Sequence, residues 1–407
     1  MNEVLYQFYH LGGEVLEPIF REKDLPPERK GKLPGPVDLW LHASSVGEAT
    51  VAAAILEEFL KIRPKTSVLL TLFTPTGAKK ARELIKDRVK IALAPYDLPG
   101  FIDQALTCTS PKVMALIETE IWPNLIVYSH QKGAKVLLLN GRLSPKSFPR
   151  YRLVKPLLKG LFLLFSGLAV IGPSEAKRFE ALGAPLEKIQ IFGNAKHDLL
   201  KKRAESLDPE IFRKRLRIGQ EEIIVFGSVR HGEEKAIVRS IKGLWPRKNL
   251  VFIVVPRHLK RLITLERSLN KEGLSFIRWS RLKGRREQRI VVVDEIGPLF
   301  GLYSLAKVAF VGGSLVPKGG QNPMEPAAFG VPVLFGPHME NFENEARGLK
   351  KRGGGFVVQD TRELIFLVEE LLDNRKLYNQ ASFGARKTLK DLTGAASKQA
   401  QWLAQFL

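Results

Sequence analysis

A serine and a glutamate, Ser45 and Glu48, stand three residues apart just after the apolar run of residues 37–43. This is the spacing of a capping box, in which the glutamate returns a hydrogen bond to the start of a helix. A carboxylate held there can also remove a proton from a substrate hydroxyl. The spacing alone favours the capping role. Because the positive end of the helix dipole favours the charged form, we expect Glu48 to be ionised at neutral pH.

Two further acids, Glu118 and Glu120, follow the apolar run of residues 113–117 in the segment IETEIWPN. Side chains alternate along an extended chain, which would put both glutamates on one side. Two neighbouring carboxylates can share a proton or orient a substrate hydroxyl. The alternative, two solvated acids, fits poorly with the apolar residues on either side.

A glycine-rich stretch, residues 311–342, reads VGGSLVPKGGQNPMEPAAFGVPVLFGPHMENF. Asn322, Pro323 and Glu325 have the spacing of an N-cap, a first helical residue and a capping-box acid. The start of such a helix would direct free N–H groups at the glycine loop and bind phosphate or carboxylate. The alternative is an ordinary strand, turn and helix whose glycines only make turns.

Basic and hydroxyl side chains also gather in expected loops. Arg142 and Lys146 lie among hydroxyls in residues 140–151, which suits a phosphorylated or carboxylated ligand or else a solvated loop. Arg257 follows an apolar run, residues 250–255, where it could hold a phosphate with two hydrogen bonds. Thr74, in TLFTPTG, could cap its helix or touch an acceptor phosphate, and we favour capping.

The elements that must position these residues alternate between strand and helix, which predicts an α/β fold with doubly wound parallel sheets. We expect an N-terminal segment at 1–35 and Rossmann-like domains at 36–200 and 201–407, with a last helix that can cross back to the first domain. Ligands bind beyond the carboxyl ends of strands in such sheets. The strands are expected at residues 37–43, 67–73, 89–92, 113–117, 135–139, 168–171, 188–192, 223–226, 250–255, 289–293, 306–311 and 331–335.

The composition of the chain narrows the classes of partner that it can bind. The chain has 407 residues, 64 Lys and Arg against 42 Asp and Glu, and a net charge of +22. Such a charge suits nucleic acid, an anionic membrane or an acidic substrate, unless it reflects a basic proteome or a thermophilic source. One cysteine excludes an intrachain disulfide, and cytosolic exposure is the simplest inference. The histidines are scattered without ligand spacing, so we expect no essential metal.

The N-terminal residues 4–20 place apolar side chains at helical spacing. They predict an amphipathic helix, broken or kinked near Gly12 and Gly13, that either packs on the first domain or lies in a membrane interface. No run is long enough to span a membrane, and acidic residues interrupt what would be a cleaved signal.

Between His42 and Phe342, nine short motifs in order resemble the 3-deoxy-D-manno-octulosonic acid (Kdo) transferases, which move Kdo from CMP-Kdo onto a lipid A precursor. Two positions depart from the family pattern: Gln321 stands where histidine is usual, and Pro298 where an acid is usual. The motifs are SVGE (45–48), ETEIWPN (118–124), NGRLSPKS (140–147), GNAKHD (193–198), SVRHGEE (228–234), PRHLKR (256–261), DEIGPL (294–299), GGSLVPKGGQNPME (312–325) and GPHMENF (336–342).

This resemblance implies the GT-B fold, two Rossmann-like domains facing a central cleft, with the acceptor on the first domain and CMP-Kdo on the second. It implies Kdo transfer with inversion to lipid IVA in lipopolysaccharide biosynthesis, with Glu48 as the base. The implied catalytic residues are Glu48, Glu118, Glu120 and Lys196. The implied acceptor-binding residues are Ser45, Gly47, Thr74, Arg142 and Lys146. The implied donor-binding residues are Ser228, Pro256, Arg257, Ile296, Gly297, Gly319, Gly320, Gln321, Asn322, Pro323, Met324, Glu325 and Asn341.

The resemblance further implies a peripheral enzyme on the cytoplasmic face of the bacterial inner membrane, with the lipid A precursor, CMP-Kdo and an anionic membrane surface as partners. It implies no cofactor, no metal, no nucleic acid and no obligate protein partner. Three rival functions stay open at this point. They are a GT-B enzyme that uses a different nucleotide sugar, a nucleic-acid-binding protein, and a membrane-surface scaffold without activity.

Overall fold

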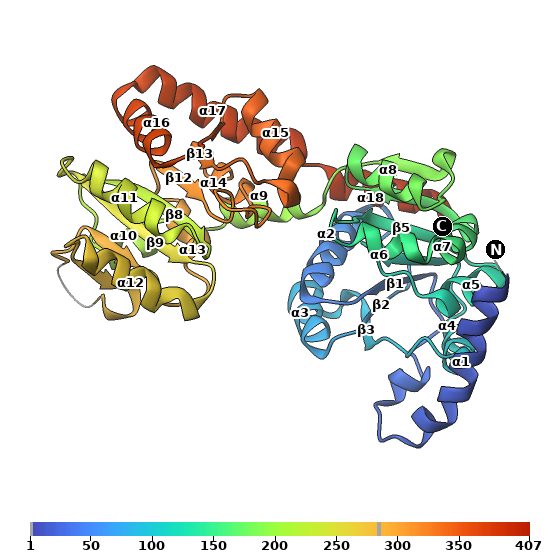
Figure 1. Ribbon diagram of the computed structural model, residues 1–407. Helices are drawn as coiled ribbons and strands as arrows, with labels where there is room; N and C mark the ends of the chain where they lie inside the picture. Colours follow the sequence, from blue (N-terminus) through green and yellow to red (C-terminus); the bar gives the residue numbers. More distant parts are fainter. Residues whose placement is uncertain (1–2, 283–285) are drawn as a thin grey trace. The chain divides into compact units, whose positions relative to one another are not determined.

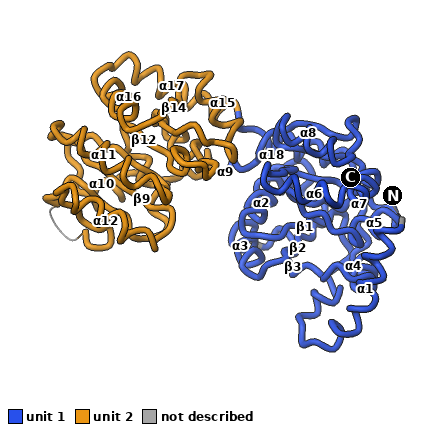
Figure 2. The backbone as a smooth tube through the Cα atoms, viewed as in Figure 1, with its two compact units in different colours: residues 1–199, 392–407 blue, residues 200–391 orange. Residues whose placement is uncertain are grey.

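The computed structural model describes residues 3–282 and 286–407. The chain forms two compact units (Figure 2). Unit 1 comprises Met1–Leu199 and Leu392–Leu407, and unit 2 comprises Leu200–Asp391. The C-terminal helix α18 (Ala395–Leu403) therefore belongs to unit 1, although the long segment just before it, Leu200–Asp391, builds unit 2.

Unit 1 is built on a seven-stranded parallel sheet in the order β3-β2-β1-β4-β5-β6-β7. The strand order reverses between β1 and β4, which pair directly, and ligands of such sheets bind beyond the strand ends at this point. The strands are β1 (Leu39–Ala43), β2 (Val68–Leu72), β3 (Lys90–Leu93), β4 (Val113–Ile117), β5 (Lys135–Gly141), β6 (Phe165–Val170) and β7 (Ile189–Ile191).

Helices cover both faces of this sheet (Figure 1). The helices α2, α3 and α18 pack on one face, and α1, α4, α5, α7 and α8 pack on the other. Because both faces are covered, β1, β2 and β4 are buried along their whole length. The helices are α1 (Glu3–Glu22), α2 (Val46–Ile62), α3 (Pro75–Ile85), α4 (Pro99–Thr109), α5 (Pro123–Gln131), α6 (Phe148–Leu153), α7 (Lys155–Leu164) and α8 (Pro173–Ala181).

Unit 2 repeats the architecture with a parallel sheet in the order β10-β11-β9-β8-β12-β13-β14, which reverses between β8 and β12. Its strands are β8 (Glu222–Val229), β9 (Leu250–Pro256), β10 (Phe276–Arg278), β11 (Ile290–Val292), β12 (Val308–Val311), β13 (Val333–Phe335) and β14 (Gly355–Val357). Its helices are α10 (Glu210–Leu216), α11 (Glu234–Leu244), α12 (Leu262–Lys271), α13 (Leu299–Tyr303), α14 (Met324–Ala327), α15 (Glu343–Lys351), α16 (Thr361–Asp373) and α17 (Arg375–Leu392), while α9 (Lys196–Glu205) spans the boundary at 199/200.

The predicted α/β class with two doubly wound parallel sheets is confirmed. The edge strands β10 and β14 were not predicted, because each has only three residues and neither stands in a long apolar run. The expected break in the N-terminal helix is wrong, since α1 continues through Gly12 and Gly13. A Cβ atom on Gly13 would lie 2.8 Å from Pro99 Cδ, so this glycine allows α1 to pack closely on α4.

Polar contacts fix one face of α1 to the rest of unit 1. The Tyr9 hydroxyl donates to Asp97 Oδ2 at 2.9 Å, and Glu17 Oε2 accepts from Gly100 N at 2.6 Å. Asp97 is buried, which raises its pKa to about 6. The opposite face of α1 is solvent-exposed, with 70% of Phe8 and 74% of Val15 accessible. None of the described helices combines the length and apolar character needed to cross a bilayer.

Candidate active site

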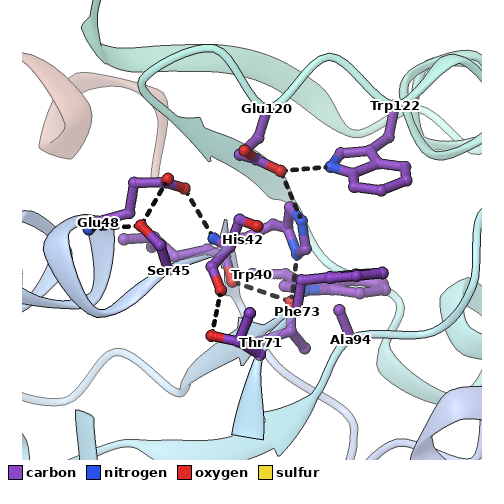
Figure 3. Close-up of polar contacts among 12 residues, drawn as sticks. Trp40, His42, Ser45, Glu48, Thr71, Phe73, Ala94, Glu120 and Trp122 are labelled. Atoms are coloured by element: carbon purple, nitrogen blue, oxygen red, sulfur yellow. Dashed lines mark hydrogen bonds and ion pairs between the residues drawn. The ribbon is translucent and has the colours of Figure 1, made fainter. Parts of the chain in front are cut away.

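Glu48 lies in the first turn of α2, directly beyond the carboxyl end of β1. Its carboxylate accepts hydrogen bonds from Ser44 N at 2.7 Å and from Ser45 Oγ at 2.8 Å (Figure 3). Ser45 in turn accepts from Glu48 N at 3.4 Å and caps the helix. The predicted reciprocal capping is therefore present, and it holds the carboxylate in one orientation at the point where the strand order reverses.

The ionisation of Glu48 differs from the expectation. Burial, and next the charge of Glu120, raise the pKa of Glu48 to about 7, against the hydrogen bonds from Ser44 and Ser45. The sequence predicted a carboxylate that is fully ionised at neutral pH. This prediction is wrong because burial and the charge of Glu120 outweigh the hydrogen bonds that favour the charged form. A carboxylate with a pKa near 7 is well suited to act as a general base.

The sequence predicted that Glu118 and Glu120 lie side by side on an extended segment. The structure does not show this arrangement. Glu118 has a φ of 59°, so the chain turns sharply where β4 ends. Glu118 Oε1 lies 2.6 Å from Lys196 Nζ, and Glu120 Oε2 accepts from Trp122 Nε1 at 2.8 Å. Each acid thus has its own partner, while the charges of both contribute to the raised pKa of Glu48.

Lys196 is placed by a residue for which the sequence suggested no specific role. Asn140 is fully buried at the end of β5 and has a φ of 52°. Its Oδ1 accepts from Ala195 N at 2.9 Å, and its own N–H donates to Gln399 Oε1 of α18 at 2.7 Å. Asn140 therefore links the loop before α9, and with it Lys196, to the C-terminal helix α18.

Among the predicted acceptor-binding residues, Thr74 has the capping role that we favoured. Thr74 Oγ1 donates to Ser44 O at 2.9 Å and accepts from Gly77 N at 3.2 Å. Gly47 is exposed beside Ser45. In the loop after β5, Lys146 is exposed and Arg142 is half-buried. Thr74, Arg142 and Lys146 lie in loops that follow β2 and β5, as the sequence predicted, whereas Gly47 lies in the first turn of α2 after β1.

In unit 2, the predicted donor loops are organised by Glu233, which the sequence did not single out. Its side chain is fully buried between the loops after β8 and β12. One carboxylate oxygen accepts from Ser314 N and Leu315 N, both at 3.0 Å. The other accepts from Gly313 N at 2.7 Å and Arg230 N at 2.8 Å. The pair of glutamates in SVRHGEE was the only available signal for this residue.

The helix start at Asn322 is shorter than the sequence suggested, and the anion site expected there stays a prediction. Asn322 Oδ1 does accept from Met324 N at 3.0 Å, but the helix it begins, α14, has only four residues. Three amides of the first glycine loop bind Glu233 instead of facing a ligand.

The second glycine pair has a different role. Gly319 and Gly320 have φ values of 82° and 71°, and a Cβ atom on them would collide with Asn341 and Met339. These glycines therefore let the GPHMENF loop approach, and Asn341 N donates to Gly319 O at 3.0 Å. Gln321 Nε2 donates to Gly320 O at 2.9 Å within the same loop.

Three more of the predicted donor residues, Pro256, Arg257 and Glu325, lie at or just after the end of β9 and in α14. Pro256 ends β9, and Arg257 N donates to Val229 O at 2.9 Å while its side chain is exposed. Burial raises the pKa of Glu325, against the charges of Arg203 and Arg257.

Four of the predicted donor residues differ sharply in exposure. Pro323 and Met324 are buried, and so is Ser228, which has a φ of 56°. Ile296 is 90% exposed and precedes Gly297, whose φ is 118°. Among residues 3–282 and 286–407 there is no cluster of three or more His, Cys, Asp or Glu residues able to hold a metal.

Two solved structures share this fold. A glycosyltransferase from Rickettsia africae is 14% identical with a TM-score of 0.60, over 91% of this chain and 99% of that one. A UDP-GlcNAc 2-epimerase from Neisseria meningitidis is also 14% identical, with a TM-score of 0.62 over the same shares. At this identity the likeness shows the fold alone, namely two Rossmann-like domains of the GT-B type.

Sequence comparisons are more specific. The family model of the 3-deoxy-D-manno-octulosonic-acid transferases matches residues 19–199. A bifunctional glycosyltransferase/methyltransferase from Fusobacterium nucleatum is 34% identical over 83% of this chain, which spans only 53% of that longer protein. A 3-deoxy-D-manno-octulosonic acid transferase from Haemophilus influenzae is 32% identical over 382 residues, 92% of this chain and 88% of the relative. The chain therefore belongs to the 3-deoxy-D-manno-octulosonic acid transferase family of glycosyltransferases.

Proposed function

We propose that this protein transfers Kdo from CMP-Kdo to a sugar hydroxyl of a lipid A precursor, with inversion at the Kdo anomeric carbon. Glu48 removes the hydroxyl proton as the oxygen forms its bond to that carbon. The bond from the carbon to the CMP phosphate breaks, and CMP leaves with the electron pair. The observation that carries this proposal is the fixed carboxylate of Glu48 at the end of β1, with a pKa of about 7.

Unit 2 is proposed to bind CMP-Kdo through the loops after β8, β9, β11 and β12. Arg257 offers an exposed guanidinium, which can hold the leaving phosphate with two hydrogen bonds. Glu325 is half-buried near Arg257 and Arg203, and a carboxylate there can accept ribose hydroxyls. Ile296 offers an exposed apolar side chain, on which a base could lie.

The decisive experiment measures CMP release from CMP-Kdo with and without a tetra-acylated lipid A precursor. We expect release that depends on the precursor, and a product whose anomeric configuration by NMR is opposite to that of CMP-Kdo. Release of UDP from a UDP-sugar in place of CMP would favour the rival transferase. Binding to anionic vesicles, or salt-dependent binding to generic DNA, with CMP-Kdo left intact would favour the non-catalytic rivals.

We also propose that α1 lies on the cytoplasmic face of the inner membrane. One face of α1 is fixed to unit 1, so its exposed apolar face is presented rigidly, and the net charge of +22 favours anionic lipids. Packing on the first domain, one of the two alternatives left open by the sequence, is what the contacts of α1 show, and the membrane contact of its exposed face is our proposal.

Exposed apolar residues of α1 provide a test. Phe8→Ser combined with Val15→Ser should weaken binding to vesicles containing phosphatidylglycerol by about a hundredfold or more, because burial of such side chains contributes about 1.5–3 kcal/mol each. Vesicle co-sedimentation measures this. Phe383→Ser on α17 is the matched control, because Phe383 is 70% exposed like Phe8. Equal weakening by the control variant would contradict a specific role for α1.

A further inference from the structure

A line of buried polar side chains lies along one face of the sheet of unit 1 and leads toward Glu120 (Figure 3). Trp40 and His42 lie on the same face of β1, and Thr71 is the register partner of His42 on β2. Trp40 Nε1 donates to Thr71 Oγ1 at 2.8 Å, and Thr71 Oγ1 lies 3.0 Å from His42 Nδ1. His42 is 2% exposed, and its Nε2 lies 3.8 Å from Glu120 Oε2.

The donors in this line favour one direction for its protons. An indole N–H can only donate, so Thr71 accepts from Trp40 and its own proton remains to be donated. His42 Nδ1 at 3.0 Å is a nearer acceptor than Leu41 O at 3.4 Å. A neutral imidazole that accepts at Nδ1 carries its proton on Nε2, which faces Glu120. At 3.8 Å this contact is electrostatic, and Trp122 Nε1 makes the hydrogen bond to the same oxygen.

We propose that His42 is a positioning residue that keeps its Nε2 proton directed at Glu120 and so holds Glu120 as a fixed negative charge beside Glu48. This inference rests on the proposed function, because it assigns to Glu120 the task of tuning the base. The charge of Glu120 is second only to burial among the causes that raise the pKa of Glu48. Without that charge, Glu48 would be a weaker base with a lower pKa.

Other charged groups face the same place. Asp97, from the loop after β3, interacts electrostatically with His42. Glu118 also raises the pKa of Glu48 and is paired with Lys196. The charge of Glu120 adds to the effect of burial in raising the pKa of Tyr151.

Two substitutions of His42 separate its roles. In His42→Gln the amide nitrogen can take the place of Nε2 and still donate to Glu120, whereas in His42→Asn the side chain reaches only as far as Nδ1. In a plot of kcat/KM against pH, we expect an acidic limb with its midpoint near 7 for the wild type and for His42→Gln. For His42→Asn the midpoint should fall by about 1 pH unit, because Glu120 is no longer held beside Glu48 and its charge raises the pKa of Glu48 less.

A purely structural role for His42 would lower activity in both variants and leave the midpoint unchanged. Glu120→Gln should move the midpoint as His42→Asn does, and the double variant should move it no further. If the wild type transfers Kdo with a Glu48-dependent acidic limb while both His42 variants keep its midpoint, the inference is overturned and the proposed function stands.

Two NMR measurements on the full chain do not need turnover. With 15N-labelled histidine, His42 should carry a proton on Nε2 and none on Nδ1 at neutral pH, and its signal is identified by its loss in His42→Gln. An unprotonated Nε2 would overturn the inference. With 13C-labelled glutamate carboxyls, the titration midpoint of Glu48 should fall in His42→Asn and not in His42→Gln. Absence of Kdo transfer by the wild type would overturn the proposed function while these signals still decide the role of His42.

Discussion

Glutamine in place of Glu48 should lower kcat for Kdo transfer by about 10²–10⁴-fold, the usual contribution of a general base. The amide keeps the shape of the carboxylate and can still accept the hydrogen bond from Ser44 N, so α2 keeps its start. It cannot take a proton from the acceptor hydroxyl. The measurement is kcat at saturating CMP-Kdo and lipid A precursor, with chemical denaturation to confirm that the variant is folded.

The pH dependence sharpens this prediction. A base must be unprotonated to act, so wild-type activity should rise with pH through about 7, the pKa of Glu48. The residual activity of Glu48→Gln should lack this rise. Glu83→Gln is a suitable control, because Glu83 is exposed on α3 and pairs with Lys80. A wild-type kcat in Glu48→Gln would remove Glu48 from the mechanism.

The placement of Glu48 could be predicted from the sequence because it depends on local signals. An apolar run predicts a strand, and a capped helix start just after it predicts a residue at the strand's carboxyl end. The loop after β4 was found in the same way. In both cases the chemistry lies within a few residues of the pattern that reveals it.

The pKa of Glu48 could not be predicted, because it depends on packing. The raised pKa needs burial by surrounding side chains and the charge of Glu120, which is 72 positions away along the chain. Glu118 shows the same limit: alternation assumed an extended backbone, whereas the strand ends in a left-handed turn at that residue. The local spacing of residues in the sequence indicates neither the raised pKa of Glu48 nor the turn at Glu118.

Contacts between distant loops were also beyond the sequence. Glu233 binds amides that lie 80 to 82 positions further along the chain. The two glycines at 319 and 320 were interpreted as a phosphate loop, although their left-handed backbone and lack of side chains serve the approach of Asn341 and Met339. The residue types were noticed correctly, but their partners became clear only from the fold.

Replacing Glu233 by alanine should destabilise unit 2 strongly and abolish CMP-Kdo binding. Four backbone N–H groups would lose their acceptor in a site that is fully buried, and each unsatisfied group costs about 1–3 kcal/mol. Partial entry of water would offset some of this, so we expect a loss of about 3–5 kcal/mol in the free energy of unfolding. Urea denaturation followed by tryptophan fluorescence measures the loss.

Glutamine at position 233 makes the test specific to the charged acceptor. Its single carboxamide oxygen can satisfy Ser314 N and Leu315 N, but its NH₂ group would then face Gly313 N and Arg230 N, donor against donor. Glu233→Gln should therefore be destabilised almost as much as Glu233→Ala, and calorimetry should detect weaker binding of CMP. Glu272→Ala removes an exposed ion pair with Lys242 and should change neither quantity measurably. Full stability and CMP binding in Glu233→Gln would mean that Glu233 is not the ionised acceptor that shapes the donor loops.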